Sequence, residues 1–406
     1  MDSNRNPPQV TGNVVTINPK PRSSRNDLKL PCARSGHCAV ADDHNLYVFG
    51  GYNPDIPELK DYYGNVEELM PLFRELWKYN FATNTWTLEV EEKTPGQLAS
   101  MSMVRCGRFI IMYGGTGFPF GYTSTNRVRV FDTQTSHWRF YHQPKKKAPI
   151  RSYGQTVAVI KNHLYVFGGT TGWQYTSDVH RVDLHTGEWE KLFNHAEHEA
   201  QVNMYTGRPR GSQSEFPAPR YRHEMLCDGD KLYVLGGGNS ETTFALEKIS
   251  AFNLSTSKWE VVISKADPQH GYPGKRRCHG CVQLGNDGFI SGGFDGSTKI
   301  YDDIWILSLP SLQWQKLTAK LPEPVYFHAS AITPSGCLYY HGGVTSPPGD
   351  KRTDKLNCVR VKPGTLLQLS WQSVCACIQS IETIPQEKLL ELGVPRTLLD
   401  GLLPRT

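Results

Sequence analysis

The sequence has no run of eighteen apolar residues, and this absence argues against a membrane-spanning helix. Residues 1–21 are polar and contain no apolar segment, so we expect no secretory signal. The formal net charge is only +5 at pH 7 over 406 residues, too small an excess to indicate nucleic-acid binding. The sequence therefore predicts neither a membrane nor a nucleic acid as partner.

Paired cysteines with the spacing of metal ligands are also missing. The ten cysteines are scattered, and most lie in segments with strand or helix character, as buried thiols do in a reducing compartment. Cys278-His279-Gly280-Cys281 superficially suggests a zinc site, but such a site needs a second pair of ligands and none stands out nearby. We expect no metal, and a location in the cytoplasm, the nucleus or both.

The sequence shows no nucleophile–base spacing and no Gly-rich phosphate loop at a strand–helix junction. We therefore expect a non-catalytic protein that needs no cofactor.

What the sequence does contain is a repeated strand that ends in two glycines. A lone Trp follows five of the six copies, after further segments of strand-like alternation. Units with four short strands and Gly at the bends predict the blades of a β-propeller, in which each Trp fills space between neighbours. The strand copies occupy residues 46–51, 109–115, 164–169, 232–237, 288–293 and 337–343, and the Trp residues are Trp86, Trp138, Trp189, Trp259 and Trp314.

The sixth unit lacks both a closing Trp and an outermost strand. Residues 10–17 have strand character but belong to no unit. We therefore predict an all-β, six-bladed propeller over residues 10–362, in which the N-terminal strand completes the last blade and removes an open sheet edge. Residues 1–9 are expected to be flexible.

Two insertions interrupt the repeats: residues 53–72 are rich in Pro, Asp, Glu and Tyr, and residues 193–219 are polar and show no apolar periodicity. Each is interpreted as a long loop, for which a binding role and a merely solvated one are both open.

Residues 363–406 form a separate tail with helical character. Residues 365–381 place apolar side chains on one face, and two shorter segments, 385–393 and 395–403, have Pro near the start and Gly near the end. Three such helices are too short to build a core of their own, so we expect them to pack on the propeller or to await a partner.

The glycine pairs and Trp residues resemble the kelch motif, and six copies resemble a six-bladed kelch propeller. In the tail, Thr365-Leu366-x-x-x-Ser370-x-x-x-Val374 is similar to the elongin-binding BC box, with Ser370 where that family usually has Cys. Farther on, Val394-Pro395-x-x-Leu398-x-x-x-Leu402 resembles the cullin-2 box. Both motifs after a propeller resemble the kelch substrate receptors of cullin-2 RING ubiquitin ligases.

This resemblance implies an adaptor whose tail docks on elongin B/C and on cullin-2 with its RING protein. It also implies that the propeller captures the C-terminus of a target protein, which in relatives ends in a small residue such as Gly or Ala. The alternative is a kelch scaffold for cytoskeletal or signalling interactions. On the receptor interpretation, Leu366, Ser370 and Val374 contact elongin, whereas Val394, Pro395, Leu398 and Leu402 contact cullin-2.

A free C-terminal carboxylate is best bound by Arg, whose planar guanidinium donates two parallel hydrogen bonds. The polar segment before the first strand of each unit, here called the lead-in, supplies Arg and Tyr that could ring the mouth of the central channel. Some of these charges could instead hold blades together. The candidates for degron binding are Arg151, Tyr153, Arg220, Tyr221, Arg222, Arg276, Arg277 and Tyr326.

A histidine recurs at one position of four lead-ins, and a repeated position indicates a structural hydrogen bond in each blade. These residues are His37, His223, His279 and His328.

Overall fold

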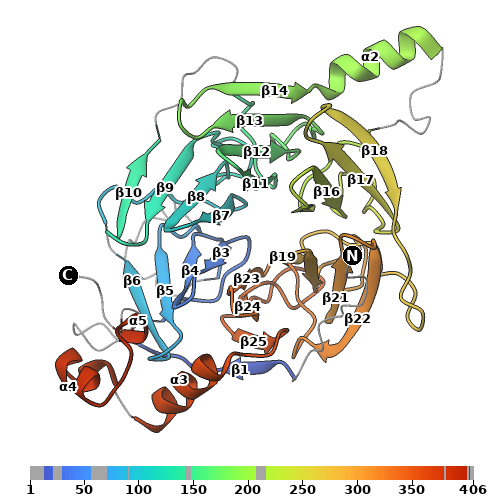
Figure 1. Ribbon diagram of the computed structural model, residues 1–406. Coiled ribbons are helices and arrows are strands. Elements are labelled where there is room, and N and C mark those ends of the chain that lie inside the picture. Colours follow the sequence, from blue (N-terminus) through green and yellow to red (C-terminus); the bar gives the residue numbers. More distant parts are fainter. Residues whose placement is uncertain are drawn as a thin grey trace.

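The computed structural model describes residues 13–21, 30–55, 71–89, 91–141, 148–206, 216–378, 381–399 and 402. Six antiparallel sheets stand around a central channel like the blades of a propeller, as Figure 1 shows. The predicted six-bladed propeller is confirmed. The segment expected to be flexible, residues 1–9, lies outside the described residues.

Each blade starts at the channel and runs outward through successive strands. The first three blades contain, in this order, β3 (Cys38–Ala41), β4 (Asn45–Phe49), β5 (Leu76–Asn80) and β6 (Thr85–Glu89); β7 (Ser102–Cys106), β8 (Phe109–Tyr113), β9 (Val128–Asp132) and β10 (His137–Phe140); and β11 (Thr156–Ile160), β12 (His163–Phe167), β13 (Val179–Asp183) and β14 (Trp189–Phe193).

The other three blades repeat this plan. They contain β15 (Glu224–Cys227), β16 (Lys231–Leu235), β17 (Lys248–Asn253) and β18 (Lys258–Ile263); β19 (Gly280–Leu284), β20 (Asp287–Ser291), β21 (Asp303–Ser308) and β22 (Gln313–Lys320); and β23 (Ala329–Ile332), β24 (Cys337–His341) and β25 (Leu356–Arg360).

The fourth strand of blade six comes from the other end of the chain. Strand β1 (Val15–Ile17) pairs antiparallel with β25, with Val15 opposite Cys358 and Ile17 opposite Leu356. The prediction that an N-terminal strand completes the last blade is therefore confirmed. A short strand that the sequence did not predict, β2 (Lys20–Pro21), runs parallel to β6 in blade one.

The Trp residues pack between blades, as the sequence predicted. Trp138 of blade two contacts Phe49 of blade one with ring centroids 5.5 Å apart, and Trp189 contacts Tyr113 of blade two at 5.6 Å. Each ring covers the second strand of the preceding blade, so the apolar core consists of a series of interfaces between neighbouring blades.

The glycine pairs permit close approach between blades. Gly168 has φ of 66°, and a β-carbon at this position would lie 2.7 Å from Cε1 of His223 in the next blade. Any side chain there would clash and strain the backbone, which explains why the strand ends in glycine.

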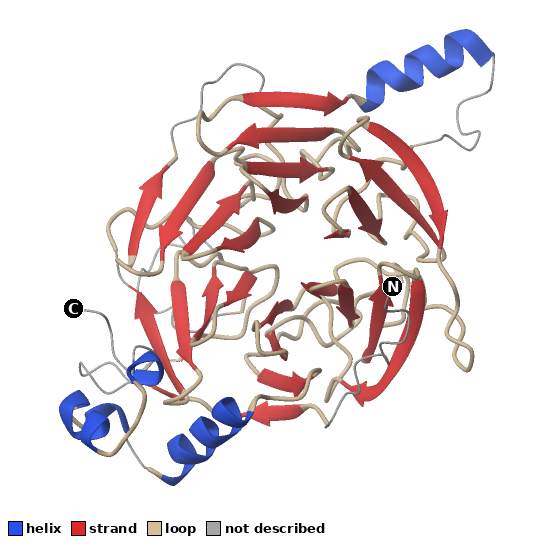
Figure 2. Ribbon diagram, in the orientation of Figure 1, coloured by secondary structure: helices blue, strands red, loops and turns tan. Residues whose placement is uncertain are grey.

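Two regions correct the expectations. The insertion after blade three contains a helix, α2 (His195–Thr206). We expected a loop there, because this segment shows no apolar periodicity. In Figure 2 this helix projects from the outer edge of the propeller, far from the helices of the tail.

The tail forms a small core of its own around Ile381, Leu389, Leu399 and Leu402, with Ala82 of blade one packed against it. Its elements are α3 (Leu366–Cys377), η2 (Ile381–Thr383), α4 (Gln386–Glu391) and α5 (Arg396–Leu399). Among the described helices, none has the length and apolar character needed to cross a membrane.

Candidate binding site at the channel mouth

A closed circle of backbone hydrogen bonds surrounds one end of the channel. One residue from each lead-in donates its N–H to the carbonyl oxygen of the corresponding residue in the preceding blade, over 2.8 to 3.0 Å. All six have φ between 54° and 66°, the left-handed region. This circle, here called the collar, consists of Gly36, Ser100, Gly154, Arg222, Cys278 and Phe327.

The side chain of Arg222 crosses the opening of the collar. Its Nη2 donates a hydrogen bond to Oγ of Ser100 in blade two, and its guanidinium lies over the ring of Phe327 in blade six, 4.6 Å from the centroid. A β-carbon at Gly36 of blade one would lie 3.1 Å from Nη2. Contacts with three different blades place this guanidinium near the axis of the propeller. It forms no ion pair with any described carboxylate.

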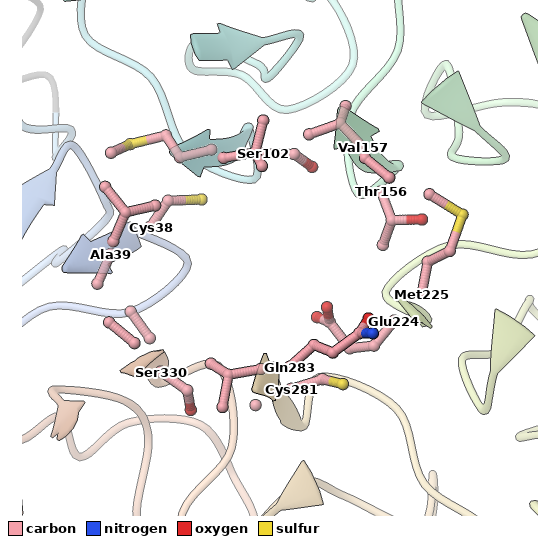
Figure 3. A pocket seen from close by; sticks show the side chains of 18 of the residues that line it. Cys38, Ala39, Ser102, Thr156, Val157, Glu224, Met225, Cys281, Gln283 and Ser330 are labelled. Carbon is pink, nitrogen blue, oxygen red and sulfur yellow. The ribbon is translucent and has the colours of Figure 1, made fainter. Parts of the chain in front are cut away.

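Below the collar, the channel forms a cavity of about 830 Å³ lined by the first strands of all six blades. Figure 3 shows hydroxyl, thiol and carboxyl groups on its wall, among them Ser102, Cys38 and Glu224. Burial raises the pKa of the Glu224 carboxyl to about 8, although the nearby Arg222 acts to lower it. The carboxyl group is therefore largely protonated at neutral pH and leaves the charge of Arg222 uncompensated.

Aromatic rings form the wall of the mouth on blades five and six. Tyr326 is buried and stacks on Phe294, with centroids 5.2 Å apart, and also contacts Phe327 at 5.3 Å. Two further cations lie along this wall. Arg277 donates to the carbonyl oxygen of Asn239 over 3.2 Å, and the guanidinium of Arg352 lies 5.0 Å from the ring of Tyr52.

Blades three and four contribute three more of the residues that the sequence analysis proposed for degron binding. Tyr221 is half-buried and contacts Tyr175, with centroids 5.4 Å apart. Burial raises the pKa of Tyr153, and the nearby positive charge of Arg222 acts to lower it. Arg151 is exposed at the outer end of its lead-in. The structure thus brings Tyr153, Tyr221 and Arg222 together, whereas Arg151 lies farther out.

The structure places Arg220 and Arg276 elsewhere than expected. Arg276 is fully buried in blade five, where Nη1 donates to the Gly292 carbonyl over 2.9 Å and to Oδ1 of Asp303 over 2.7 Å. Its guanidinium also lies over the ring of Tyr301. Arg34 makes the equivalent contacts in blade one. These arginines hold their own blades together, which is the structural role the sequence analysis left open.

Arg220 follows the same plan in blade four but lacks a carboxylate. Its Nη1 donates to the Gly236 carbonyl over 3.0 Å, and its guanidinium lies over Phe244, 3.8 Å from the centroid. The register of the sheet puts Lys248 where blade five has Asp303. Burial without a counter-ion lowers the pKa of Arg220 to about 9. We therefore assign Arg220 to the blade wall rather than to the channel mouth.

The lead-in histidines pack against the glycine pair of the preceding blade. Nε2 of His223 lies 3.0 Å from Oγ1 of Thr156, and Nε2 of His37 lies 3.1 Å from the His341 carbonyl oxygen. Burial lowers the pKa of His223 to about 3 and that of His328 to about 4, so both rings are neutral at pH 7. His279 is as deeply buried, but neither ring nitrogen has a hydrogen-bond partner in the described structure, so the expectation of a hydrogen bond fails there.

The family model of the KLHDC2/KLHL20/DRC7 Kelch-repeats domain matches residues 19–207 and 198–383. The chain is 44% identical to human Kelch domain-containing protein 10 over 373 residues, which cover 92% of this chain and 80% of that protein. It is 35% identical to the homolog from Drosophila melanogaster over 93% of this chain. This chain belongs to the kelch domain-containing protein 10 family.

A more distant relative also matches most of the chain. Kelch domain-containing protein 2 from Bos taurus is 25% identical over 384 residues, which cover 86% of each chain. Membership of the kelch family establishes the propeller, on which sites of many kinds occur, so function has to be argued from the channel mouth and the tail.

The predicted elongin-binding residues lie on an exposed helix. Thr365 caps α3 through a capping box with Gln368, and no side chain of this helix is buried. Leu366 is 84% exposed and Ser370 is exposed, whereas Val374 packs against the tail core. An exposed leucine at the start of a well-capped helix is available to a partner.

The predicted cullin-2-binding residues are divided between surface and core. Pro395 is exposed and Leu398 is half-buried, whereas Val394 packs on the tail core and Leu402, 3% exposed, is part of it. Leu402 therefore supports the exposed residues of the tail from its core.

Sequence reasoning missed several residues of the mouth for two different reasons. Phe294 and Arg352 occupy loops after the glycine pairs, and loops of variable length carry no periodic signal. Ser100 and Phe327 do lie in lead-ins but are neither Arg nor Tyr. Their left-handed backbone could not be read from residue type. Within the described residues, no three potential metal ligands gather at one place.

Proposed function

We propose that this chain is the substrate-recognition subunit of a cullin-2–elongin B/C RING E3 ubiquitin ligase. The propeller binds the C-terminus of a target protein, which ends in a small residue such as Gly or Ala, and the tail docks on elongin B/C and cullin-2 with its RING protein. The observation that carries this proposal is the guanidinium of Arg222, which lies at the axis with no carboxylate partner in the described structure.

A terminal carboxylate suits this place for electrostatic reasons. The Ser100 hydroxyl occupies one donor of Arg222, and Glu224 is held largely neutral at pH 7, so the positive charge is available to an anion. Arg277 adds positive potential along the wall, and Arg352 lies there too, in a 3.9 Å ion pair with the exposed carboxylate of Asp55. A charge-assisted pair in a partly desolvated mouth is stronger than one at an open surface.

The rings around the mouth support selection for a small last residue. The Arg222 guanidinium lies over Phe327, Tyr326 contacts Phe327 from the side, and Tyr221 lies within range of the charge of Arg222. These rings limit the space next to a bound carboxylate. A large terminal side chain would have to displace an aromatic ring, so discrimination follows from steric exclusion.

The exposed leucines of α3 support docking of the tail. Leu366, Leu367 and Leu369 are 84%, 53% and 44% exposed, an apolar surface that a soluble protein seldom leaves uncovered. They coincide with the segment that resembles the BC box. In the proposed complex this surface binds elongin, and the chain acts as a non-catalytic adaptor.

The assembled complex would ubiquitinate the bound target and direct it to the proteasome. We propose that this takes place in the cytoplasm, the nucleus or both, where the cysteines, none of which forms a disulfide in the described structure, remain thiols.

The test is a pull-down of the purified chain with elongin B/C and cullin-2, with and without residues 364–406. We expect capture that depends on the tail and that Leu366→Ala with Ser370→Asp abolishes, at an unchanged melting temperature because neither side chain is buried. Leu392→Ala, at another exposed leucine of the tail, is the control. Undiminished capture by the double variant, or none by the wild type, would favour the scaffold alternative.

A further inference from the structure

Four aromatic side chains are exposed together on loops of blades two and three. Phe118 and Phe120 are each 40% exposed, Tyr122 is 69% exposed and Trp173 is 71% exposed. The first three lie between β8 and β9, and Trp173 lies between β12 and β13. Clustered exposed rings of this size generally mark an interaction surface. We refer to these four residues as the aromatic patch.

The rings of the patch are held in place by one another. Tyr122 and Trp173 meet edge to face, with centroids 5.5 Å apart. Phe120 contacts Tyr52 of blade one at 5.0 Å, and Phe118 stacks on the same ring at 6.4 Å. The loop between β8 and β9 thus carries two groups of rings, one that reaches Trp173 of blade three and one that reaches Tyr52 of blade one.

The backbone of the two loops is fixed as well. A β-carbon on Gly172 would lie 2.9 Å from Cα of Gly121, so the two loops touch at paired glycines. The N–H of Gly121 donates to Oγ1 of Thr116, and that of Gly172 to Oγ1 of Thr170, each over 3.0 Å. A surface ordered before binding loses less conformational entropy when a ligand arrives.

Tyr153 connects the patch to the axis. Its backbone pairs with Thr170 through two hydrogen bonds of 2.9 Å, at the base of the Trp173 loop. A β-carbon on Gly172 would lie 3.7 Å from the Tyr153 hydroxyl, which in turn feels the charge of Arg222. A chain bound with its carboxylate at Arg222 can thus continue over Tyr153 towards Trp173.

The charges around the patch favour a chain with carboxylates. The loop segments 117–126 and 170–177 contain no acidic residue. Arg127 directly follows the first loop and Arg151 precedes β11, and both are exposed. The side chain of Asn126 donates to the Pro149 carbonyl over 2.7 Å, which brings these two segments together. Asp178, which follows the second loop, is paired with Lys191 over 3.4 Å. Both the terminal carboxylate and acidic side chains upstream would meet positive potential here.

We propose that the aromatic patch binds the stretch of a substrate chain directly upstream of its C-terminal residues and selects an apolar or aromatic side chain there. This inference rests on the proposed function, because it assumes that the substrate terminus lies at Arg222. The occupant is an extended peptide that runs outward across blade three. Its upstream apolar side chain packs on Tyr122 and Trp173.

The experiment measures binding of fluorescent peptides to the purified chain. Long peptides end in Gly or Ala and carry one Leu or Trp placed about three to nine residues from the end, at roughly 3.3 Å of reach per residue. A short peptide lacks the upstream stretch, and an amidated long peptide lacks the carboxylate. The variants are Trp173→Ala and Tyr122→Ala. The control is Phe140→Ala, an exposed ring on the outer strand β10.

We expect Trp173→Ala and Tyr122→Ala each to weaken the long peptide about tenfold, as the loss of a buried contact residue does. Binding of the short peptide and the melting temperature should stay unchanged. Equal affinity of the long peptide for wild type and both variants, together with lost binding of the amidated peptide, would overturn this inference alone. Equal binding of free and amidated peptides would overturn the proposed function, and this inference with it. Loss of a wild-type dimer in Trp173→Ala, with no change in peptide affinity, would assign the patch to self-association instead.

Discussion

The guanidinium of Arg222 in blade four donates a hydrogen bond to the hydroxyl of Ser100 in blade two, so one side chain joins two blades that are not neighbours in the ring. The hydroxyl is a neutral acceptor. An incoming carboxylate is a stronger acceptor for the same donor, so it can displace Ser100 at little cost. The structure thus holds this arginine in position without neutralising it.

The buried and axial arginines are expected to behave differently on removal. Arg276→Ala leaves Asp303 without its cation and should lower the free energy of unfolding by about 3–5 kcal/mol. Arg222→Ala removes no ion pair, so it should cost at most about 1 kcal/mol while peptide binding is lost. Urea unfolding and peptide anisotropy on both variants provide the measurement. Equal destabilisation by the two substitutions would contradict the assignment of Arg222 as a cation that pairs with no carboxylate among the described residues.

Glu224 should make binding depend on pH. Because its folded pKa is about 8, it gains negative charge as pH rises from 7 to 9, pairs with Arg222 and repels a carboxylate ligand. The thiols nearby stay neutral over this range, since burial raises the pKa of Cys38 and of Cys278 to about 12. Peptide affinity should therefore fall in the wild type but stay level in Glu224→Gln. The control is Glu241→Gln, on an exposed loop; a pH profile in Glu224→Gln that matched this control would argue against the coupling.

The buried histidines should make the fold sensitive to acid. Their folded pKa values lie below the unfolded value of about 6.5, so the unfolded state binds more protons as pH falls. Stability is therefore complete above about pH 6.5 and is lost as pH falls towards the folded pKa, by up to about 1.4 kcal/mol per pH unit for each ring. The measurement is urea unfolding between pH 7 and 5.

A glutamine variant isolates the contribution of one ring. Gln155 of blade three packs against Gly114 of blade two much as His223 of blade four packs against Gly168 of blade three, so Gln is accommodated at this position. His223→Gln should reduce the slope of stability against pH by about one proton. His185→Gln, in an exposed turn, should leave the slope unchanged. An unaltered slope in His223→Gln would show that other groups cause the acid sensitivity.

The strand that completes blade six should be essential to the whole ring. Ile17 packs into the interface between blades six and one, and Val14 packs into that between blades five and six. Ile17→Asp would place a charge at a half-buried apolar position and should lower the free energy of unfolding by about 2 kcal/mol. Val15→Asp, at a side chain that is 61% exposed, is the matched control. Equal melting temperatures for the two variants would mean that β1 does not stabilise the ring.

The repeats revealed the blades because each glycine pair and each Trp serves a packing need that recurs in every unit. Gly168 and Trp189 could be placed from the sequence since their contacts depend on spacing alone. The lead-in arginines could not be told apart in this way. Arg276 is buried because Asp303 begins the third strand of its blade, at a distance along the chain that differs between blades.

The channel mouth was foreseeable only in part. Arg222 and Tyr221 were predicted from their residue types, but the collar depends on a left-handed φ at Ser100, Cys278 and Phe327, which side-chain identity does not reveal. The tail core escaped prediction for a similar reason. Leu389 and Leu399 come from separate short helices, and their contact is set by the turns between them rather than by periodicity.

The pairing of β1 with β25 sets an order of events during synthesis. The ribosome makes β1 long before its partner, so five blades can form on the emerging chain while the sixth waits for Leu356–Arg360. Helix α3 begins at Leu366, only a few residues later, and the Arg360 side chain donates to Gln372 on that helix. The segment that resembles the elongin-binding motif thus leaves the ribosome only after the last strand of the propeller. A nascent chain therefore cannot present its tail to a partner before all the strands of its propeller have been made.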